Sequence, residues 1–143
     1  MEYPAIFEPD REAGGYVVTF PDVPEAITQG ASEPEAVKRA RDALETALSF
    51  YIEKGVPLPK PGKAKRRKVR MVSVTALAAA KLGLYSAWLA SGVKKADFAR
   101  RLGIPKSNVD RLFDLMHHTR MDQIEAALGL FGKTLVVDVK DAA

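Results

Sequence analysis

The first sixty residues alternate between apolar and polar positions in a pattern that predicts a small sheet. Apolar side chains recur with a period of two at 3–7 and again at 16–20, which is typical of strands with one buried face. The polar, glycine-closed segment 10–15 between them predicts a turn, so the two strands should pair antiparallel. A third short strand is predicted at 26–30, after the prolines that end the second.

A long helix is predicted next. Ser32, Pro34 and Glu35 form its start, with a serine cap, a proline in the first turn and a glutamate that completes a capping box. Gly55 and Pro57 end the helix. Apolar residues recur along one side (Val37, Ala40, Leu44, Ala47, Leu48 and Tyr51), and polar residues occupy the other (Lys38, Asp42, Glu45 and Ser49). The helix should therefore cover one face of the sheet.

The segment 57–68 interrupts this pattern with prolines, a glycine and the basic run Lys63–Lys68. Beyond it, residues 69–74 have the composition of a strand. We assign this strand to the same sheet, because an isolated strand has no hydrogen-bonding partner. The prediction is an α+β domain over residues 1–74, with a small antiparallel sheet, one covering helix and a basic loop at 57–68.

The second half is predicted to be helical almost to its end. Helices are expected at 75–91, 94–102, 106–115 and 121–130, followed by a strand, Thr134–Val139, that has no local partner. We expect these elements to form a second domain over residues 75–143.

The stretch from residue 95 to 114 matches the pattern of a helix-turn-helix. Ala99 supplies the small residue needed where the second helix crosses the first, and Gly103 supplies the left-handed turn. Apolar residues fall at the offsets that close the angle between the helices: Phe98, Leu102, Ile104, Val109 and Leu112. The alternative to a DNA-binding motif is an ordinary bent helical hairpin that only contributes to the protein core. The full pattern and the basic charge of this half favour DNA binding.

The second helix of this motif carries side chains that can pair with base edges near its N-terminus, namely Lys106, Ser107, Asn108 and Arg111. The first helix offers cations suited to phosphate contacts, namely Lys94, Lys95, Arg100 and Arg101. Asp110 either orients Arg111 or is solvated. Loss of the Arg111 side chain should cost about 1–3 kcal/mol on a specific site and relax base preference there. An equal loss on unrelated DNA would instead assign Arg111 to a phosphate.

The strand Thr134–Val139 suggests how such a protein would dimerise. Two recognition helices reach successive major grooves when they lie about 34 Å apart, which a two-fold dimer provides. An unpaired strand edge invites an identical strand from a second copy. The alternative is that this strand docks on its own chain. We expect a homodimer, with pairing of dimers into a tetramer left open.

Composition and charge narrow the possible functions. Apolar residues make up 47% of the 143 residues and charged residues 28%, which suits a globular chain. The absence of cysteine excludes disulfides, thiolate zinc sites and a cysteine nucleophile. No secretory leader or membrane span is recognisable, so we expect a soluble cytoplasmic protein. Residues 1–60 carry 6 Lys/Arg and 11 Asp/Glu, whereas residues 61–143 carry 16 Lys/Arg and 7 Asp/Glu. This contrast suggests an acidic module and a basic module that bind different partners.

The segment Phe20–Gly30, which reads Phe-Pro-Asp-Val-Pro-Glu-Ala-Ile-Thr-Gln-Gly, resembles the HicB antitoxins of bacterial type II toxin–antitoxin modules. Glu35-Ala36 and the Ala40, Ala43, Leu44 spacing extend the likeness, and the helix-turn-helix places the chain near one branch of that family. The resemblance implies a partial ribonuclease-H-like N-terminal fold without nuclease activity. It also implies a HicA toxin partner, a small basic ribonuclease that cleaves mRNA, and repression of the operon that encodes the pair.

Acidic residues of the first domain are the candidates for binding such a basic toxin: Asp22, Glu25, Glu8, Asp10 and Glu12. A two-metal nuclease is disfavoured, because nothing in the sequence brings a second acidic group to Glu8, Asp10 and Glu12. His117 and His118 point apart as neighbours and do not predict a metal site. We expect no enzyme activity, metal or cofactor; the alternative function is a stand-alone regulator whose first domain senses a small ligand.

Overall fold

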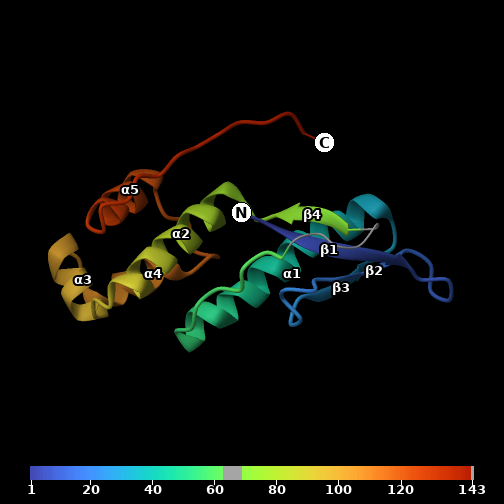
Figure 1. Cartoon of the computed structure of the whole chain (residues 1–143), viewed down its shortest axis with the longest axis horizontal. Helices are drawn as coiled ribbons and strands as arrows, with labels where there is room; N and C mark the ends of the chain where they lie inside the picture. The colour runs from blue at the N-terminus through green and yellow to red at the C-terminus, as the bar shows by residue number, and fades with distance from the viewer. Residues whose placement is uncertain (63–68, 143) are drawn as a thin grey trace. The chain divides into compact units, whose positions relative to one another are not determined.

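The computed structural model describes residues 1–62 and 69–142, and the chain divides into two compact units, Met1–Ala79 and Ala80–Ala143. Figure 1 traces both units along the chain. The predicted basic run Lys63–Lys68 lies outside the described residues. Each unit is built from its own sequence pattern and is considered by itself.

The first unit contains a four-stranded antiparallel sheet in the order β3-β2-β1-β4. The strands are β1 (Glu2–Pro9), β2 (Tyr16–Thr19), β3 (Ile27–Gly30) and β4 (Val69–Ser73). The predicted fourth strand does join this sheet, where it pairs with β1 from Glu2 opposite Ser73 to Ile6 opposite Val69. The predicted α+β fold is confirmed.

Helix α1 (Glu33–Lys54) covers the sheet as its apolar stripe predicts. Its start is the predicted capping box, in which the Ser32 hydroxyl accepts a hydrogen bond from the Glu35 N–H and the Glu35 carboxylate accepts one from the Ala31 N–H. Its end is Gly55 in the left-handed conformation (φ 67°). The buried residues of α1 are Ala36, Ala40, Leu44, Glu45, Ala47 and Leu48.

The burial of Glu45 corrects the prediction that it lies on the polar face. Its side chain is only 7% exposed, and its Oε1 accepts hydrogen bonds from the Thr75 N–H (3.1 Å) and the Thr75 hydroxyl (2.7 Å). The Thr75 hydroxyl in turn accepts a hydrogen bond from the Ala78 N–H (3.3 Å). Glu45 therefore anchors the residue that caps helix α2 (Ala76–Ser91), and helical periodicity alone does not reveal this long-range partner.

The second unit contains the rest of α2, then α3 (Lys95–Leu102), α4 (Lys106–Phe113) and α5 (Met121–Gly129). Gly92 follows α2 with φ 71°, the left-handed conformation that favours glycine. Helix α4 stops two residues before the predicted Leu115, because Asp114 adopts an extended conformation (φ −78°, ψ 109°). Within the described residues no single helix is long and apolar enough to cross a membrane; α2 and α3 would qualify only as a pair, which is bent by 117°.

The predicted strand Thr134–Val139 is not formed in the single chain. The described residues after Gly132 have no helix or strand, and the side chains of Val136, Val137 and Val139 are 83%, 69% and 90% exposed. A strand needs a hydrogen-bonding neighbour, and no described segment of this chain provides one to these residues. The alternative, in which this segment docks on its own chain as a strand, is therefore wrong for the described residues, whereas the strand that would pair with a second copy stays a prediction.

The core of the second unit is aromatic. Phe113 packs edge-on against Tyr85 (centroids 5.6 Å apart) and lies 5.1 Å from Trp88, while Phe98 lies between Phe113 and Phe131. Phe98 and Phe113 are buried, and Trp88 is half-buried. Phe113 is thus a buried core residue, and the half-buried Trp88 packs against it.

Candidate functional site

A left-handed turn joins α3 to α4. Gly103 has φ 70°, its N–H donates to the Arg100 carbonyl (3.2 Å), and the Ile104 N–H donates to the Ala99 carbonyl (3.0 Å). These bonds satisfy carbonyls at the end of α3 and direct the chain into Pro105, which precedes α4. The glycine and the buried Ala99 occupy the positions that the sequence predicts for them.

The outer face of α4 is open to solvent. Val109, Leu112 and Phe113 point into the core, whereas Lys106, Ser107 and Arg111 are exposed and Asn108 is half-buried. The surface predicted to face DNA is therefore available to a partner. Helix α4 presents its N-terminal side chains outward, as the docking of a recognition helix requires.

Two of the predicted phosphate contacts are engaged in ion pairs within the unit. Lys95 lies 2.7 Å from Asp110, with its Nζ 5.9 Å from the centre of the Trp88 ring, and Arg100 pairs with Asp97. Asp110 therefore orients Lys95 and not Arg111. Lys94 and Arg101 are exposed, and neither has an ion pair among the described residues. These pairs are on the surface, so each contributes little to stability and can rearrange when a partner binds.

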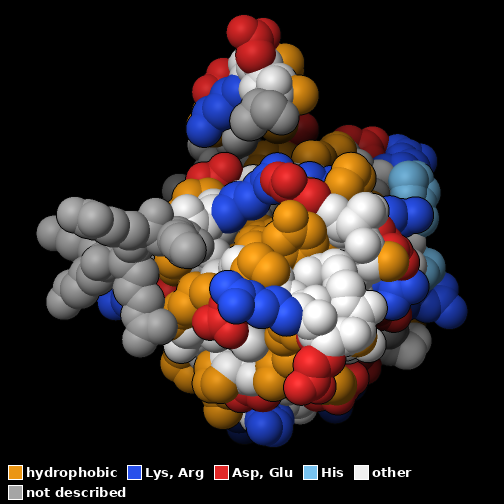
Figure 2. Space-filling model, turned by 90° about the vertical axis from the view of Figure 1, so that its right-hand side faces the viewer, with side chains coloured by type: hydrophobic (Ala, Val, Ile, Leu, Met, Phe, Trp, Pro, Cys, Tyr) orange, Lys and Arg blue, Asp and Glu red, His pale blue; other side chains and the backbone are white. Residues whose placement is uncertain are grey.

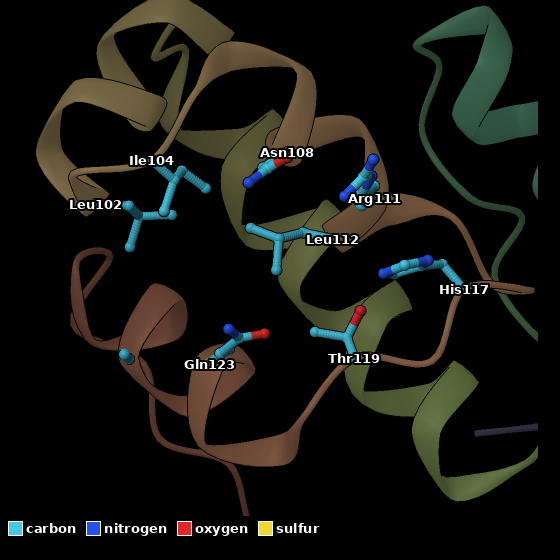
Figure 3. Close-up of a pocket in the computed structure, with 9 residues that line it drawn as sticks. Leu102, Ile104, Asn108, Arg111, Leu112, His117, Thr119 and Gln123 are labelled. Carbon is cyan, nitrogen blue, oxygen red and sulfur yellow. The ribbon is translucent and has the colours of Figure 1, made fainter.

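A hollow of about 400 Å³ lies between α4, α5 and the segment 117–119 that joins them (Figure 3). Its lining residues are Leu102, Ile104, Asn108, Arg111, Leu112, His117, Thr119, Gln123 and Ala126. Sequence reasoning predicted Asn108 and Arg111 as site residues but missed His117, Thr119 and Gln123. The available signal was a cluster of polar residues, His-His-Thr-Arg at 117–120, directly before a helix.

Lys81 organises the chain that borders this hollow. Its side chain is fully buried, and its Nζ donates hydrogen bonds to the carbonyls of Arg111 (2.9 Å), Asp114 (2.7 Å) and His117 (2.7 Å). The three hydrogens of an ammonium group match these three acceptors. Burial lowers the pKa of Lys81 to about 8, against an opposing effect of the Asp114 carboxylate. The sequence gives little sign of this role, since Lys81 is a single charge in an apolar helix.

The structure separates the five acidic residues predicted to bind a toxin. Glu8, Asp10 and Glu12 lie at the turn between β1 and β2, whereas Asp22 and Glu25 lie in the loop between β2 and β3, at the opposite end of the antiparallel strands. They do not form one surface cluster, because the length of strand β2 separates the two groups.

Three of these carboxylates are occupied within the chain. Asp22 accepts a hydrogen bond from the Gly62 N–H (2.8 Å), and Glu25 accepts one from the Tyr51 hydroxyl (2.8 Å). Asp10 accepts the N–H groups of Glu12 and Ala13 (both 3.1 Å), which closes the turn. Glu8 and Glu12 are exposed, and their carboxylates accept no hydrogen bond within the described residues. These two are the carboxylates most accessible to a partner.

No group of three or more acidic or histidine side chains among the described residues is arranged to hold a metal ion. His117 and His118 are both exposed, and Figure 2 shows histidine side chains at the surface in pale blue. His117 lines the hollow, whereas His118 is not among its lining residues. The two histidines are thus placed differently even though they are adjacent in sequence.

The division into units changes the charge comparison. The described residues of Met1–Ala79 carry 7 Lys/Arg and 11 Asp/Glu, a net charge of −4, while those of Ala80–Ala143 carry 10 and 7, a net charge of +3. Most of the basic excess counted after residue 60 therefore comes from Lys63–Lys68 and Arg70, which precede the second unit. The described surfaces keep opposite signs, but the contrast is smaller than the sequence halves suggest.

Comparisons with known proteins agree on one family. The family model described as a HicB-like antitoxin of bacterial toxin–antitoxin systems matches residues 2–83. The chain is 41% identical to "Antitoxin HicB" of Escherichia coli (strain K12) over 137 residues, covering 94% of this chain and 96% of the relative. It is 39% identical to "Antitoxin HicB 1" of Photorhabdus laumondii over 140 residues, covering 98% and 88%. Among solved structures, the N-terminal domain of the Burkholderia pseudomallei antitoxin HicB is similar, with 27% identity, a TM-score of 0.45 and coverage of 52% and 99%.

Proposed function

The chain belongs to the HicB-like antitoxins of bacterial toxin–antitoxin systems, and on this premise we propose that it neutralises a HicA-type toxin and represses its own operon. The toxin would be a small basic mRNA-cleaving ribonuclease, bound by the unit Met1–Ala79. Operator DNA would be bound by the unit Ala80–Ala143. The observation that carries this proposal is the identity of about 40% to HicB antitoxins along nearly the whole chain.

Co-expression with the neighbouring gene tests the proposal most directly. A small basic protein should co-purify with the full chain, and the purified pair should lack the ribonuclease activity of that protein alone. Recovery of the chain without a partner would favour the alternative of a stand-alone regulator with a ligand-sensing first unit. The same preparation should shift a duplex that contains the DNA upstream of its own gene.

The charge of the first unit supports recognition of a basic partner. Its described residues have a net charge of −4, and complementary charge steers association between proteins. Glu8 lies near the end of β1 and Glu12 lies in the β1–β2 turn, and their carboxylates have no partner within the described residues. Asp22, Glu25 and Asp10 stay in the proposal as contributors, although their carboxylates also stabilise the fold.

Reversal of charge at Glu8 and Glu12 should therefore slow toxin binding. The variant carrying Glu8→Lys and Glu12→Lys is expected to reduce the association rate about tenfold or more at low ionic strength, because two attractive charges become repulsive. Stopped-flow or surface-based kinetics at several salt concentrations would measure this. The matched control is Asp42→Lys with Glu53→Lys, which makes the same change in net charge on exposed positions of α1. Equal slowing by both variants would mean that net charge matters and the turn does not.

Several features support a helix-turn-helix role for α3 and α4. The left-handed Gly103 joins two short helices, and the N-terminal side chains of α4 are exposed. We propose that Lys106, Ser107 and Asn108 face base edges, that Arg111 contacts DNA, and that Lys95 and Arg101 contact phosphates. Lys95 would then exchange its pairing with Asp110 for a phosphate oxygen.

The exposed C-terminal segment supports a homodimer. Val136, Val137 and Val139 are almost fully solvated, and apolar side chains at this exposure gain stability when a partner covers them. We propose that Thr134–Val139 forms a strand only when it pairs with the same segment of a second copy. Such pairing would hold the two α4 helices of a dimer at the spacing of successive major grooves. Two dimers could then associate into a tetramer.

A further inference from the structure

The hollow between α4 and α5 is lined on its polar side by hydrogen-bond donors. Arg111, His117, Asn108, Gln123 and Thr119 contribute a guanidinium, an imidazole, two amides and a hydroxyl, and no lining residue is acidic. Arg111, His117 and Gln123 are exposed, so the hollow opens to solvent. This arrangement of donors around an open space is suited to an anion.

Thr119 is the second observation that points to a ligand. Its side chain is only 5% exposed, and its hydroxyl has no hydrogen-bond partner in the described part of the chain. Figure 3 shows this oxygen turned toward the side of the hollow where Arg111 and His117 lie. Buried hydroxyls nearly always have a partner, and a ligand oxygen held in the hollow would supply one.

The surrounding carboxylates are already occupied. Asp110 pairs with Lys95, and Asp122 pairs with Arg120, whose guanidinium lowers the pKa of that carboxyl. The Asp114 carboxylate accepts the Met116 N–H (2.9 Å). Arg111 has no ion pair among residues 1–62 and 69–142. Its guanidinium is thus free for an external anion, unlike those of Arg100 and Arg120.

The site is also held in shape before any ligand arrives. The ammonium of Lys81 binds the backbone carbonyls of both Arg111 and His117, and the His117 N–H donates to the Asp114 carbonyl (3.1 Å). A backbone that is already fixed loses little conformational entropy when its side chains bind a ligand.

We infer that Arg111, His117 and Thr119 form a binding site for a phosphate group at the junction of α4 and α5. The inference rests on the proposed DNA binding, in which this phosphate belongs to the duplex backbone. Arg111 is the sixth of the eight residues of α4, whereas the N-terminal residues of a recognition helix read bases. The inference therefore assigns Arg111 to the backbone and leaves base reading to Lys106, Ser107 and Asn108. It also adds His117 and Thr119 as contacts that position the protein on DNA.

Three single variants of the full chain test this site: Arg111→Gln, His117→Gln and Thr119→Val. Each should weaken binding to the operator duplex and to an unrelated duplex of the same length by the same factor, roughly three- to tenfold, because a phosphate contact carries no sequence information. Arg111→Gln should also reduce the slope of log K against log salt by about one. The matched control is His118→Gln, which removes an adjacent exposed imidazole outside the hollow and should bind as the wild type does.

Thermal stability separates a binding role from a structural one. Thr119→Val keeps the shape of the side chain and removes a hydroxyl that has no partner among the described residues, so the free protein should melt at the same temperature or higher. Weaker DNA binding by a variant that is no less stable supports the site. If Thr119→Val lowers DNA affinity only in proportion to a lower melting temperature, the binding role of Thr119 is overturned.

Other outcomes identify the source of the phosphate or reject the site. A loss confined to the operator for Arg111→Gln, or wild-type DNA binding by both His117→Gln and Thr119→Val, overturns the backbone assignment. A titration of the DNA-free protein with inorganic phosphate, monitored by the NMR signals of its amides, distinguishes binding of a free phosphate from binding of a DNA phosphate. The amide chemical shifts of residues 117–119 could saturate with phosphate while the variants bind DNA as tightly as the wild type. The hollow would then hold a small phosphorylated molecule, and the assignment of the phosphate to DNA would be overturned. If the wild type binds no DNA at all, the proposed repressor function fails, and the phosphate titration still tests the site.

Discussion

Replacement of Gly30 by alanine is expected to destabilise the first unit by about 3 kcal/mol or more and to abolish toxin binding at physiological temperature. Gly30 ends β3 where α1 begins to cross the sheet, and a Cβ at this position would lie 2.5 Å from the Ala36 nitrogen and 2.6 Å from its Cα. Both contacts are with helix backbone, which cannot rotate away as a side chain can. The helix must move off the sheet, and overpacking of this kind typically costs about 1–3 kcal/mol or more. Chemical denaturation followed by far-UV circular dichroism would measure the loss.

Gly83→Ala is the matched control for this experiment. Gly83 lies in the interior of α2, and apart from the local backbone of that helix a Cβ there would meet no described atom within 4 Å. The same substitution should therefore raise the free energy of unfolding by about 0.5–1 kcal/mol, because alanine favours the helix more than glycine does. If the two variants were equally stable, the close approach of β3 and α1 would have to be relaxed in solution, contrary to this prediction.

The second large effect is expected at Lys81. Lys81→Met keeps the length of the side chain but leaves the carbonyls of Arg111, Asp114 and His117 without their donor. A buried acceptor that loses its partner costs about 1–3 kcal/mol, and relief from burying the ammonium offsets part of the total. We expect a net loss of roughly 2–4 kcal/mol in the second unit and a parallel loss of DNA binding. Lys133→Met, at an exposed position of the same unit, should leave both unchanged.

The pH dependence of the wild type relative to Lys81→Met gives an independent measure. Because burial lowers the pKa of Lys81 to about 8 from 10.5, the folded chain releases this proton before the unfolded chain does. The contribution of Lys81 to the free energy of unfolding should be constant below about pH 8 and increase between pH 8 and 10.5. A flat profile up to pH 10.5, followed by a decrease above it, would instead show that the three carbonyls hold the proton more tightly than water does.

Sequence patterns predicted most of the fold because its elements are locally consistent. Period-two alternation, the Ser32 capping box and the glycines at 55 and 103 each have a local physical meaning, and the structure places them as expected. Membership of the HicB family was likewise indicated by residues 20–44 and is confirmed by the comparisons.

The predictions that failed or stay untested depend on contacts with residues distant in sequence or in a second copy. Glu45 lies on the side of α1 that periodicity marks as polar, yet it is buried because Thr75, thirty residues later, donates two hydrogen bonds to it. The strand at 134–139 has strand composition but no neighbour among the described residues. Periodicity describes which face of an element is apolar, but it does not specify which other element supplies a partner.

The candidate site was likewise predicted only as far as it depends on single helices. The exposed side chains of α4 follow from helical geometry, so Lys106, Ser107 and Arg111 were predicted correctly as surface residues. The hollow was not predicted, because it depends on where α5 meets α4 and on a lysine that binds three carbonyls. The roles of the named residues in binding toxin and DNA stay predictions.

The position of Trp88 has an optical consequence. It is the only tryptophan of the chain, and its indole ring lies against Phe113 of α4 and below the ammonium of Lys95. Excitation at the red edge of the absorption band therefore selects a fluorophore within the helical unit alone, while Tyr3, Tyr16 and Tyr51 belong to the sheet unit. The emission of the native protein thus reports on the surroundings of α4 without any attached label.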